Sequence, residues 1–176
     1  AQHCKRLGVH IDFAPDIDIN TNPKNPIIGN RSFGESKFNV AQKGVAFTKG
    51  MQSVGVLACG KHFPGHGDTE KDSHKTLPTV SFSRERLEST EFYPFQQLIS
   101  AGVASLMVGH LNVPALDEGK PTSISYKVVS GLIKQQMGFQ GLIFSDALGM
   151  KGVADYAESS QVDLQAFLAG NDILLM

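Results

Sequence analysis

The sequence predicts an α/β protein built on a parallel sheet, because short apolar runs alternate with longer amphipathic segments along all 176 residues. Strict alternation of strand and helix is typical of parallel strands joined by crossover helices. We expect five strands and four helices, beginning and ending with a strand. This pattern fits part of a (β/α)8 barrel and also a complete open doubly wound sheet, and it does not separate the two.

The expected strands are the apolar runs at residues 9–13, 54–59, 103–108, 142–144 and 173–176. A (β/α)8 barrel has eight strands and typically about 250 residues, so this chain could supply only part of one. The last run stays apolar up to Met176, where a domain would not naturally stop. In the barrel interpretation, we expect the first strands to lie outside this sequence.

The expected helices lie between the strands, at residues 36–51, 83–102, 125–138 and 161–169. Ser83 and Ser125 are expected N-caps, because a hydroxyl oxygen can accept hydrogen bonds from the free amide groups of a first turn. Glycines follow the ends of the last three helices, as is typical of helix termini. Pro94 should kink the second helix or shift its start.

Composition narrows the class of protein. The net charge is −1, which gives no reason to expect nucleic acid or an anionic membrane as a partner. No apolar run is long enough to cross a bilayer. The two cysteines make no disulfide framework, and Cys59 is expected to be a small core residue. The sequence begins with Ala1, so we expect the native start to be missing; a cytoplasmic location is expected, with periplasmic or secreted alternatives left open.

Polar side chains follow four of the expected strands. The candidates are Asp16, Asp18 and Arg31 after the first strand, Lys61 and His62 after the second, His110 after the third and Asp146 after the fourth. The carboxyl ends of parallel strands lie at one edge of a sheet, so these side chains are expected to form one active site. Each also has a structural interpretation: a turn or cap for Asp146, a salt-bridged strand end for Lys61 and His62, and a surface position for Arg31.

Three segments carry a resemblance to a known family. They are KHFPGHGDTEKDSH at residues 61–74, GLIFSDALGM at 141–150, and the segment 13–35 that ends in NRSFGE. Together, in the order in which they follow one another along the chain, they resemble glycoside hydrolase family 3, in particular its bacterial β-N-acetylglucosaminidase branch. The resemblance favours the barrel and implies that residues 1–176 are the C-terminal portion of that family's N-terminal catalytic barrel domain.

The resemblance also implies catalytic roles. Asp146 corresponds to the nucleophile, and a carboxylate can bond to a sugar carbon and leave again. His74 corresponds to the acid/base, with Asp72 orienting it. An imidazole that titrates near neutrality and is held by a carboxylate suits this task. An isolated Asp-x-His pair would more simply be an exposed loop without a role.

Substrate contacts are implied for Lys61, His62 and Arg31, which would bind sugar hydroxyls. The chain departs from the family pattern at Asp16, where relatives usually have an apolar residue. That carboxylate is expected either to alter the loop or to face solvent.

The remaining residues of the loop have less specific roles. His66 is expected to brace the loop, and His110 to line the pocket. Gly65 and Gly67 should let the loop bend and move.

The sequence therefore predicts a retaining β-N-acetylhexosaminidase that acts on a small carbohydrate, a GlcNAc-containing glycan or muropeptide, without cofactor or metal. A phosphorylase or β-glucosidase of the same family stays open, because a histidine acid/base does not repel phosphate. A metal-dependent hydrolase using the His and Asp residues at 62–74 is a second alternative, although the spacing matches no common zinc motif. A sugar-binding module without catalysis is the third.

Overall fold

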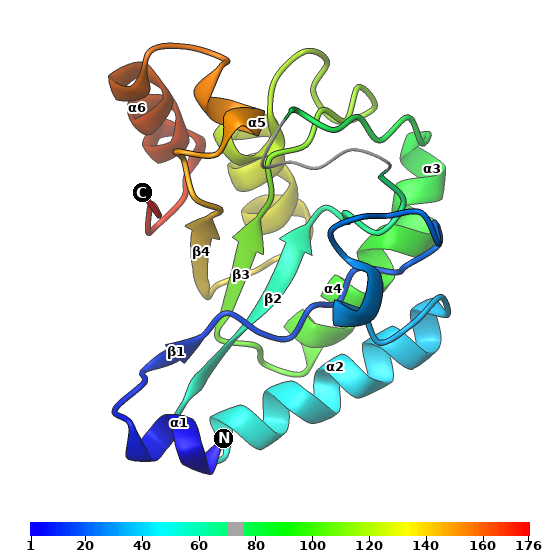
Figure 1. Ribbon diagram of the computed structural model, residues 1–176, viewed down its shortest axis with the longest axis vertical. Helices are drawn as coiled ribbons and strands as arrows, with labels where there is room; N and C mark the ends of the chain where they lie inside the picture. The colour runs from blue at the N-terminus through cyan, green and yellow to red at the C-terminus, as the bar shows by residue number, and fades with distance from the viewer. Residues whose placement is uncertain (70–75) are drawn as a thin grey trace.

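The computed structural model describes residues 1–69 and 76–176 of the chain. Within them, four parallel strands lie side by side in the order β1-β2-β3-β4 (Figure 1). These are β1 (Ile11–Asp12), β2 (Leu57–Phe63), β3 (Ser105–Val108) and β4 (Leu142–Ser145). All neighbouring pairs are parallel, which confirms the α/β class predicted from the alternating pattern.

The first strand is shorter than predicted. Only Ile11 and Asp12 pair in register with β2, opposite Leu57 and Ala58. Pro15 follows two residues after Phe13 and has no amide hydrogen, so it cannot donate to a ladder. The carbonyl groups there still accept hydrogen bonds, since Lys61 N donates to the Pro15 oxygen at 3.1 Å. The loop after β1 therefore stays tied to β2.

The second strand ends later than predicted. It continues to Phe63, which pairs with Val108 of β3 after a shift in register that begins at Gly60. Lys61 and His62 therefore lie within β2 rather than after it. The sequence did not predict this extension of β2, because the apolar run ends at Cys59 and the polar side chains of Lys61 and His62 do not continue it.

The predicted fifth strand is reduced to one parallel bridge between Phe144 and Ile173 among the described residues. Ser145 N donates to the Ile173 oxygen at 3.0 Å, so the segment does run beside β4. The Leu175 amide then donates to the Ser145 hydroxyl at 3.1 Å. The Leu175 amide thus bonds a side-chain oxygen instead of a main-chain carbonyl of β4, and regular pairing with β4 does not continue beyond Ile173.

The helices follow the predicted segments. They are α2 (Lys37–Gln52), the run α3 (Arg84–Arg86), η2 (Leu87–Glu91) and α4 (Phe92–Ser100), then η4 (Lys127–Gln136) and α6 (Ser159–Ala169). Ser83 caps as expected, accepting from Arg86 N, and the Ser125 hydroxyl accepts from Val128 N at 3.3 Å. Near Pro94 the helix neither starts nor breaks; the preceding turn η2 widens to a π-helix. Pro94 cannot donate to the carbonyl four residues back, and a π-turn accommodates such a gap.

Short helices that the apolar pattern did not predict complete the chain. They are α1 (Gln2–Arg6), η1 (Gly29–Arg31), η3 (Thr122–Ile124) and α5 (Lys151–Ala154). None is longer than five residues, so none has room for a helical repeat. No helix in the described ranges is long and apolar enough to pass through a membrane.

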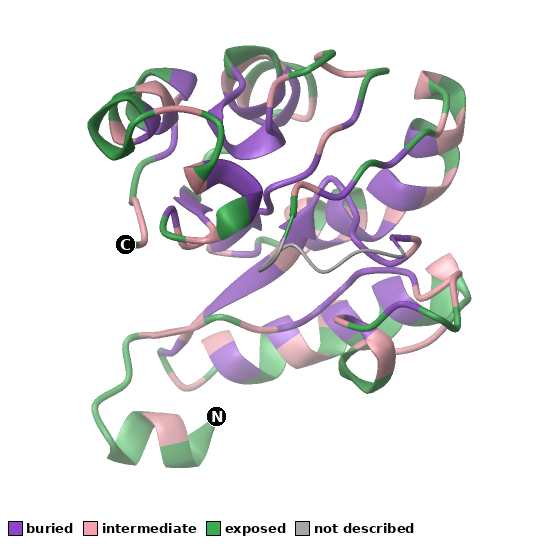
Figure 2. Cartoon of the chain, turned by 45° about the horizontal axis from the view of Figure 1, so that its top comes forward, coloured by how far each residue is buried: buried purple, intermediate pink, exposed green. Residues whose placement is uncertain are grey.

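The main core lies between one face of the sheet and helices α2, α4 and η4. Phe63 of β2 packs against Phe92 and Phe95 of α4, with ring centroids 5.4 and 5.1 Å apart. Figure 2 shows buried residues gathered on the strands and on the inward sides of these helices, while α1 is exposed. This packing fixes β2, and with it the two polar residues near its end.

The other face of the sheet carries a smaller cluster of Cys59, Met107 and Phe144. Phe13 packs edge to face on Phe144 at 5.2 Å. Cys59 is buried, which confirms it as a core residue, and burial raises the pKa of its thiol to about 11. Strands β2, β3 and β4 point the same way (Figure 1), so the loops at their carboxyl ends meet at one edge of the sheet.

Candidate active site

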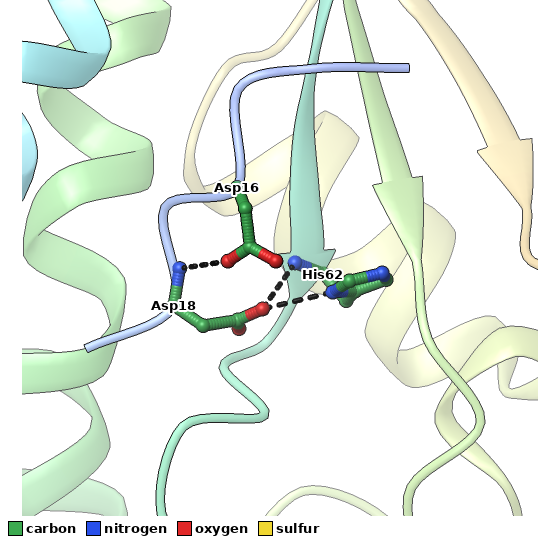
Figure 3. A group of neighbouring side chains, drawn as sticks. All are labelled: Asp16, Asp18 and His62. Atoms are coloured by element: carbon green, nitrogen blue, oxygen red, sulfur yellow. Dashed lines mark hydrogen bonds and ion pairs between the residues drawn. The ribbon is translucent and has the colours of Figure 1, made fainter. Parts of the chain in front are cut away.

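Asp18 is the hydrogen-bonding centre of the site. It lies in the loop after β1 and is fully buried. Its Oδ2 accepts from the His62 amide at 3.1 Å and from His62 Nδ1 at 2.8 Å (Figure 3). Its Oδ1 accepts from the His66 amide at 2.6 Å. One carboxylate therefore fixes both the end of β2 and the loop that follows it.

His62 is held as a neutral imidazole. Burial lowers its pKa to about 4, against the opposing charges of Asp16 and Asp146. Because a carboxylate can only accept, Nδ1 carries the proton toward Asp18 and Nε2 is left as an acceptor. Arg31 Nη2 lies 3.4 Å from this Nε2. The predicted substrate residues His62 and Arg31 are thus brought together.

Asp16 does not face solvent, so of the two expectations for this carboxylate, an altered loop or a solvent-facing position, the second was wrong. Its side chain is only 6% exposed, and its Oδ1 accepts from the Asp18 amide at 3.2 Å. Its Oδ2 lies 3.4 Å from Arg31 Nη2. Burial, together with the nearby charge of Asp18, raises the pKa of Asp16 to about 7. Asp18 is the member of this pair that ionises first as the pH rises, since three N–H groups stabilise its charge although burial raises its pKa.

Asp146 stands at the end of β4, as predicted, and is partly accessible. Its amide donates to the Val108 oxygen of β3 at 2.9 Å, and its Oδ1 accepts from the Ala147 amide at 2.9 Å. Its charge raises the pKa of His62, while that of Lys61 lowers it. Both charges therefore act on the His62 imidazole, which lies near the end of β2.

His110 is buried rather than lining an open pocket. Its Nε2 lies 2.9 Å from the Ala147 carbonyl, which can only accept, so Nε2 carries a proton. Its Nδ1 lies 2.7 Å from the Ser123 hydroxyl. His110 therefore braces the turn that carries Asp146 from the neighbouring strand end.

The loop after β2 is clamped onto the loop after β1. Asn25 Nδ2 donates to the His66 oxygen at 2.8 Å, and its Oδ1 accepts from the Ile27 and Ile28 amides at 2.9 Å each, just before η1, which carries Arg31. The His66 ring, with Nδ1 2.6 Å from Thr69 Oγ1, is buried. This supports His66 as a brace of the loop.

Gly67 fixes the loop rather than loosening it. A Cβ added at this position would collide with the Ile19 carbonyl group. Gly65 has a φ of 128°, which allows the bend that we expected there. At Gly67 two backbones approach each other directly, which accounts for glycine there, and the movement of the loop stays a prediction.

Two predicted catalytic residues, Asp72 and His74, lie outside the described residues. Their roles remain predictions. Sequence reasoning gave Asp18 and Asn25 no role as anchors, because their partners lie more than 40 positions away along the chain. One local signal for Asp18 exists: it is a carboxylate between two buried isoleucines, Ile17 and Ile19.

Asp16, Asp18 and His62 have possible metal-donor atoms within 4.8 Å of one another. Both oxygens of Asp18 and Nδ1 of His62 are already used in hydrogen bonds. The Arg31 guanidinium also lies beside Asp16 and His62, where it would repel a cation. We therefore assign no metal ligands here. That the chain needs no metal stays a prediction, for which exhaustive chelation followed by an activity assay is the test.

A partly accessible carboxylate at the end of β4, with a buried histidine near the end of β2 and an arginine beside that histidine, lies at the strand ends of an α/β sheet, the place where glycosidases of the barrel class have their sites. The chain belongs to glycosyl hydrolase family 3. Residues 1–176 match the family model described as "Glycosyl hydrolase family 3 N terminal domain".

Individual relatives agree with this assignment. The chain is 38% identical to beta-hexosaminidase A of Pseudoalteromonas piscicida, over 97% of this chain and 30% of that relative. The structure of a family 3 beta-N-acetylglucosaminidase from Paenibacillus sp. str. FPU-7 superimposes with a TM-score of 0.95 at 42% identity, covering 98% of this chain and 33% of that one. A structure titled beta-glucoside phosphorylase BglX gives a TM-score of 0.97 at 29% identity, covering 100% of this chain and 34% of that one.

The chain thus spans about a third of the length of these relatives. Of the two folds that the alternating pattern allowed, the likeness confirms the barrel-type α/β fold rather than an open doubly wound sheet. The chain forms part of such a barrel.

Proposed function

We propose that the protein containing this chain is a retaining glycoside hydrolase that removes terminal β-linked N-acetylglucosamine. The observation that carries the proposal is the placement of Asp146. Its accessible carboxylate is anchored through the Ala147 amide, and its charge acts on the buried His62. The relatives named beta-hexosaminidase and beta-N-acetylglucosaminidase support the sugar. Residues 1–176 would be the C-terminal portion of the catalytic barrel domain.

In the proposed mechanism, the Asp146 carboxylate bonds to the anomeric carbon as the glycosidic C–O bond breaks. His74, oriented by Asp72, gives its proton to the leaving oxygen. The now neutral His74 then takes a proton from water, which attacks the anomeric carbon and releases the Asp146 carboxylate. Two inversions at one carbon leave the product in the β configuration.

Substrate recognition would come from the two neighbouring loops. Arg31, whose side chain is 42% exposed, keeps N–H groups available for sugar hydroxyls. The charge of Lys61 acts on its neighbour His62, and neutral His62 offers an acceptor at Nε2. The finer proposal is that the sugar belongs to a peptidoglycan-derived fragment. Comparing turnover of a muropeptide with that of chitobiose by the complete natural chain tests it.

Asp146→Gly is the decisive variant. It should abolish turnover of an aryl β-N-acetylglucosaminide, and azide should restore part of the activity by entering the vacated space. A single displacement inverts the anomeric carbon, so the glycosyl azide should have the α configuration by NMR. Azide should leave the unchanged enzyme unaffected. Near-normal turnover by Asp146→Gly without azide would remove Asp146 from the nucleophile role.

A phosphorylase is the second candidate, supported by two observations. The structural neighbour titled beta-glucoside phosphorylase superimposes closely. Arg31 also places a cation beside His62, and the charge of Lys61 acts on the same imidazole, so a phosphate ion could bind there. Incubation with inorganic phosphate discriminates the two, because a phosphorylase would release a sugar 1-phosphate in place of the free sugar.

A further inference from the structure

Asp16 is a buried carboxylate at a position where the family resemblance leads us to expect an apolar residue. Its Oδ1 has a partner in the Asp18 amide. Its Oδ2 is closed to solvent and finds no hydrogen bond among the described residues, only the Arg31 Nη2 at 3.4 Å. Leaving a buried carboxylate without its cationic partner is costly, so the ionised Asp16 strongly favours keeping Arg31 beside it.

Arg31 is held from two sides. Its Nη2 is shared between Asp16 Oδ2 and His62 Nε2, at 3.4 Å each. Its Nη1 lies 3.4 Å from the Ile27 oxygen on its own loop. Figure 3 shows Asp16 and Asp18 reaching from that loop toward His62 at the end of β2. Without Asp16, the described residues would leave the neutral His62 imidazole as the one side-chain contact of the guanidinium.

We propose that Asp16 is a positioning residue, whose ionised carboxylate holds the Arg31 guanidinium against His62 in the orientation that binds substrate. The part concerning substrate rests on the proposed function. Asp16 acts through Arg31, because its Oδ2 is closed to solvent and cannot itself reach a sugar.

The proposal makes substrate binding depend on pH. The groups that face Asp16 are Asp18, His62 and Arg31. Of these, His62 stays neutral above about pH 4, and three N–H groups stabilise the charge of Asp18. Asp16, with its pKa of about 7, is therefore the member that changes near neutrality. Below about pH 7 its carboxyl group takes up a proton and loses its hold on Arg31. KM should therefore rise as the pH falls through this range, while kcat follows other groups.

Asp16→Asn tests this in the complete natural chain. The amide keeps the size of the side chain and an oxygen for the Asp18 amide, but removes the charge. We expect KM for an aryl β-N-acetylglucosaminide at pH 8 to rise about tenfold, with kcat within about twofold, since roughly one charge-assisted contact is lost. The rise of KM below pH 7 should disappear. On an Arg31→Ala background, Asp16→Asn should add little, because the two residues act as one unit.

Asp163→Asn, the same chemical change on the outer helix α6, is the matched control and should leave KM and its pH dependence unaltered. An unchanged KM and pH profile in Asp16→Asn would overturn the proposal. A kcat loss equal to the KM effect would also overturn it, because it would indicate general damage to the site.

A readout without substrate separates this proposal from the proposed function. The guanidinium NMR signals of Arg31, followed from about pH 5 to pH 9, should show a step near pH 7 that is absent in Asp16→Asn. If the enzyme were inactive on the sugar but showed this step, the proposed function would fail and the role of Asp16 would stand. Absence of the step in the unchanged protein would overturn the role of Asp16, whatever the activity.

Discussion

At the residue scale, the close approach at Gly67 joins the two loops that build the site. Any side chain there meets the Ile19 carbonyl, which belongs to the backbone and cannot rotate away. The same stretch of chain supplies Asp18 to the His62 and His66 amides. A shift of one loop therefore moves Asp18 relative to His62.

Gly67→Ala should accordingly destabilise the protein by about 1–3 kcal/mol, the usual cost of overpacking. Thermal unfolding measures this as a lower Tm. Gly50→Ala is the control, because Gly50 lies in α2 with open space around its Cα, and alanine there should be neutral or stabilising. Equal Tm values for the two variants would show that the loops can separate without cost.

At the element scale, His110 connects the end of β3 to the turn after β4. Its ring bonds the carbonyl of Ala147, the same residue whose amide donates to the Asp146 carboxylate. His110→Ala should therefore lower kcat by about tenfold or more through misplacement of Asp146, with a smaller effect on KM. Steady-state kinetics on an aryl substrate measures both. Ser123→Ala, which removes only the Nδ1 partner, should have a milder effect. A KM effect alone would indicate that His110 contacts substrate.

The sequence predicted the strands and helices correctly where a short stretch of residues alone determines the structure. Alternating apolar runs located β3, β4 and the long helices, and Ser83 and Ser125 capped as hydroxyl residues do. The extension of β2 through Lys61 and His62 depends on pairing with β3, which no local pattern contains. The same holds for the clamp between Asn25 and the His66 carbonyl, since it joins two loops far apart in sequence. Asp146, by contrast, was placed correctly because it directly follows an apolar strand.

At the scale of the whole molecule, β1 and β4 are the outer strands of an open sheet. Helix α6 also presents Leu164, Phe167 and Leu168, which are 56%, 64% and 62% exposed. Apolar groups gathered on one helix favour association, and so does the sheet edge at β1, whereas the segment around Ile173 runs beside β4. Residues 1–176 expressed alone should therefore self-associate and lack turnover, as light scattering and an activity assay would show. A monomer with a sharp thermal transition and full turnover would contradict this prediction.

The buried carboxyl group of Asp16 has a consequence for the free energy of unfolding. Its folded pKa is raised to about 7 from 3.8, so the folded state holds a proton that the unfolded state releases. Its stabilising effect is complete below about pH 4 and is lost as the pH rises through 7. Asp16→Asn, which cannot ionise, should gain in Tm relative to the unchanged protein between these pH values and keep that advantage at pH 8. The variant expected to bind sugar less well would then be the more heat-resistant one, so selection for thermostability alone would remove Asp16.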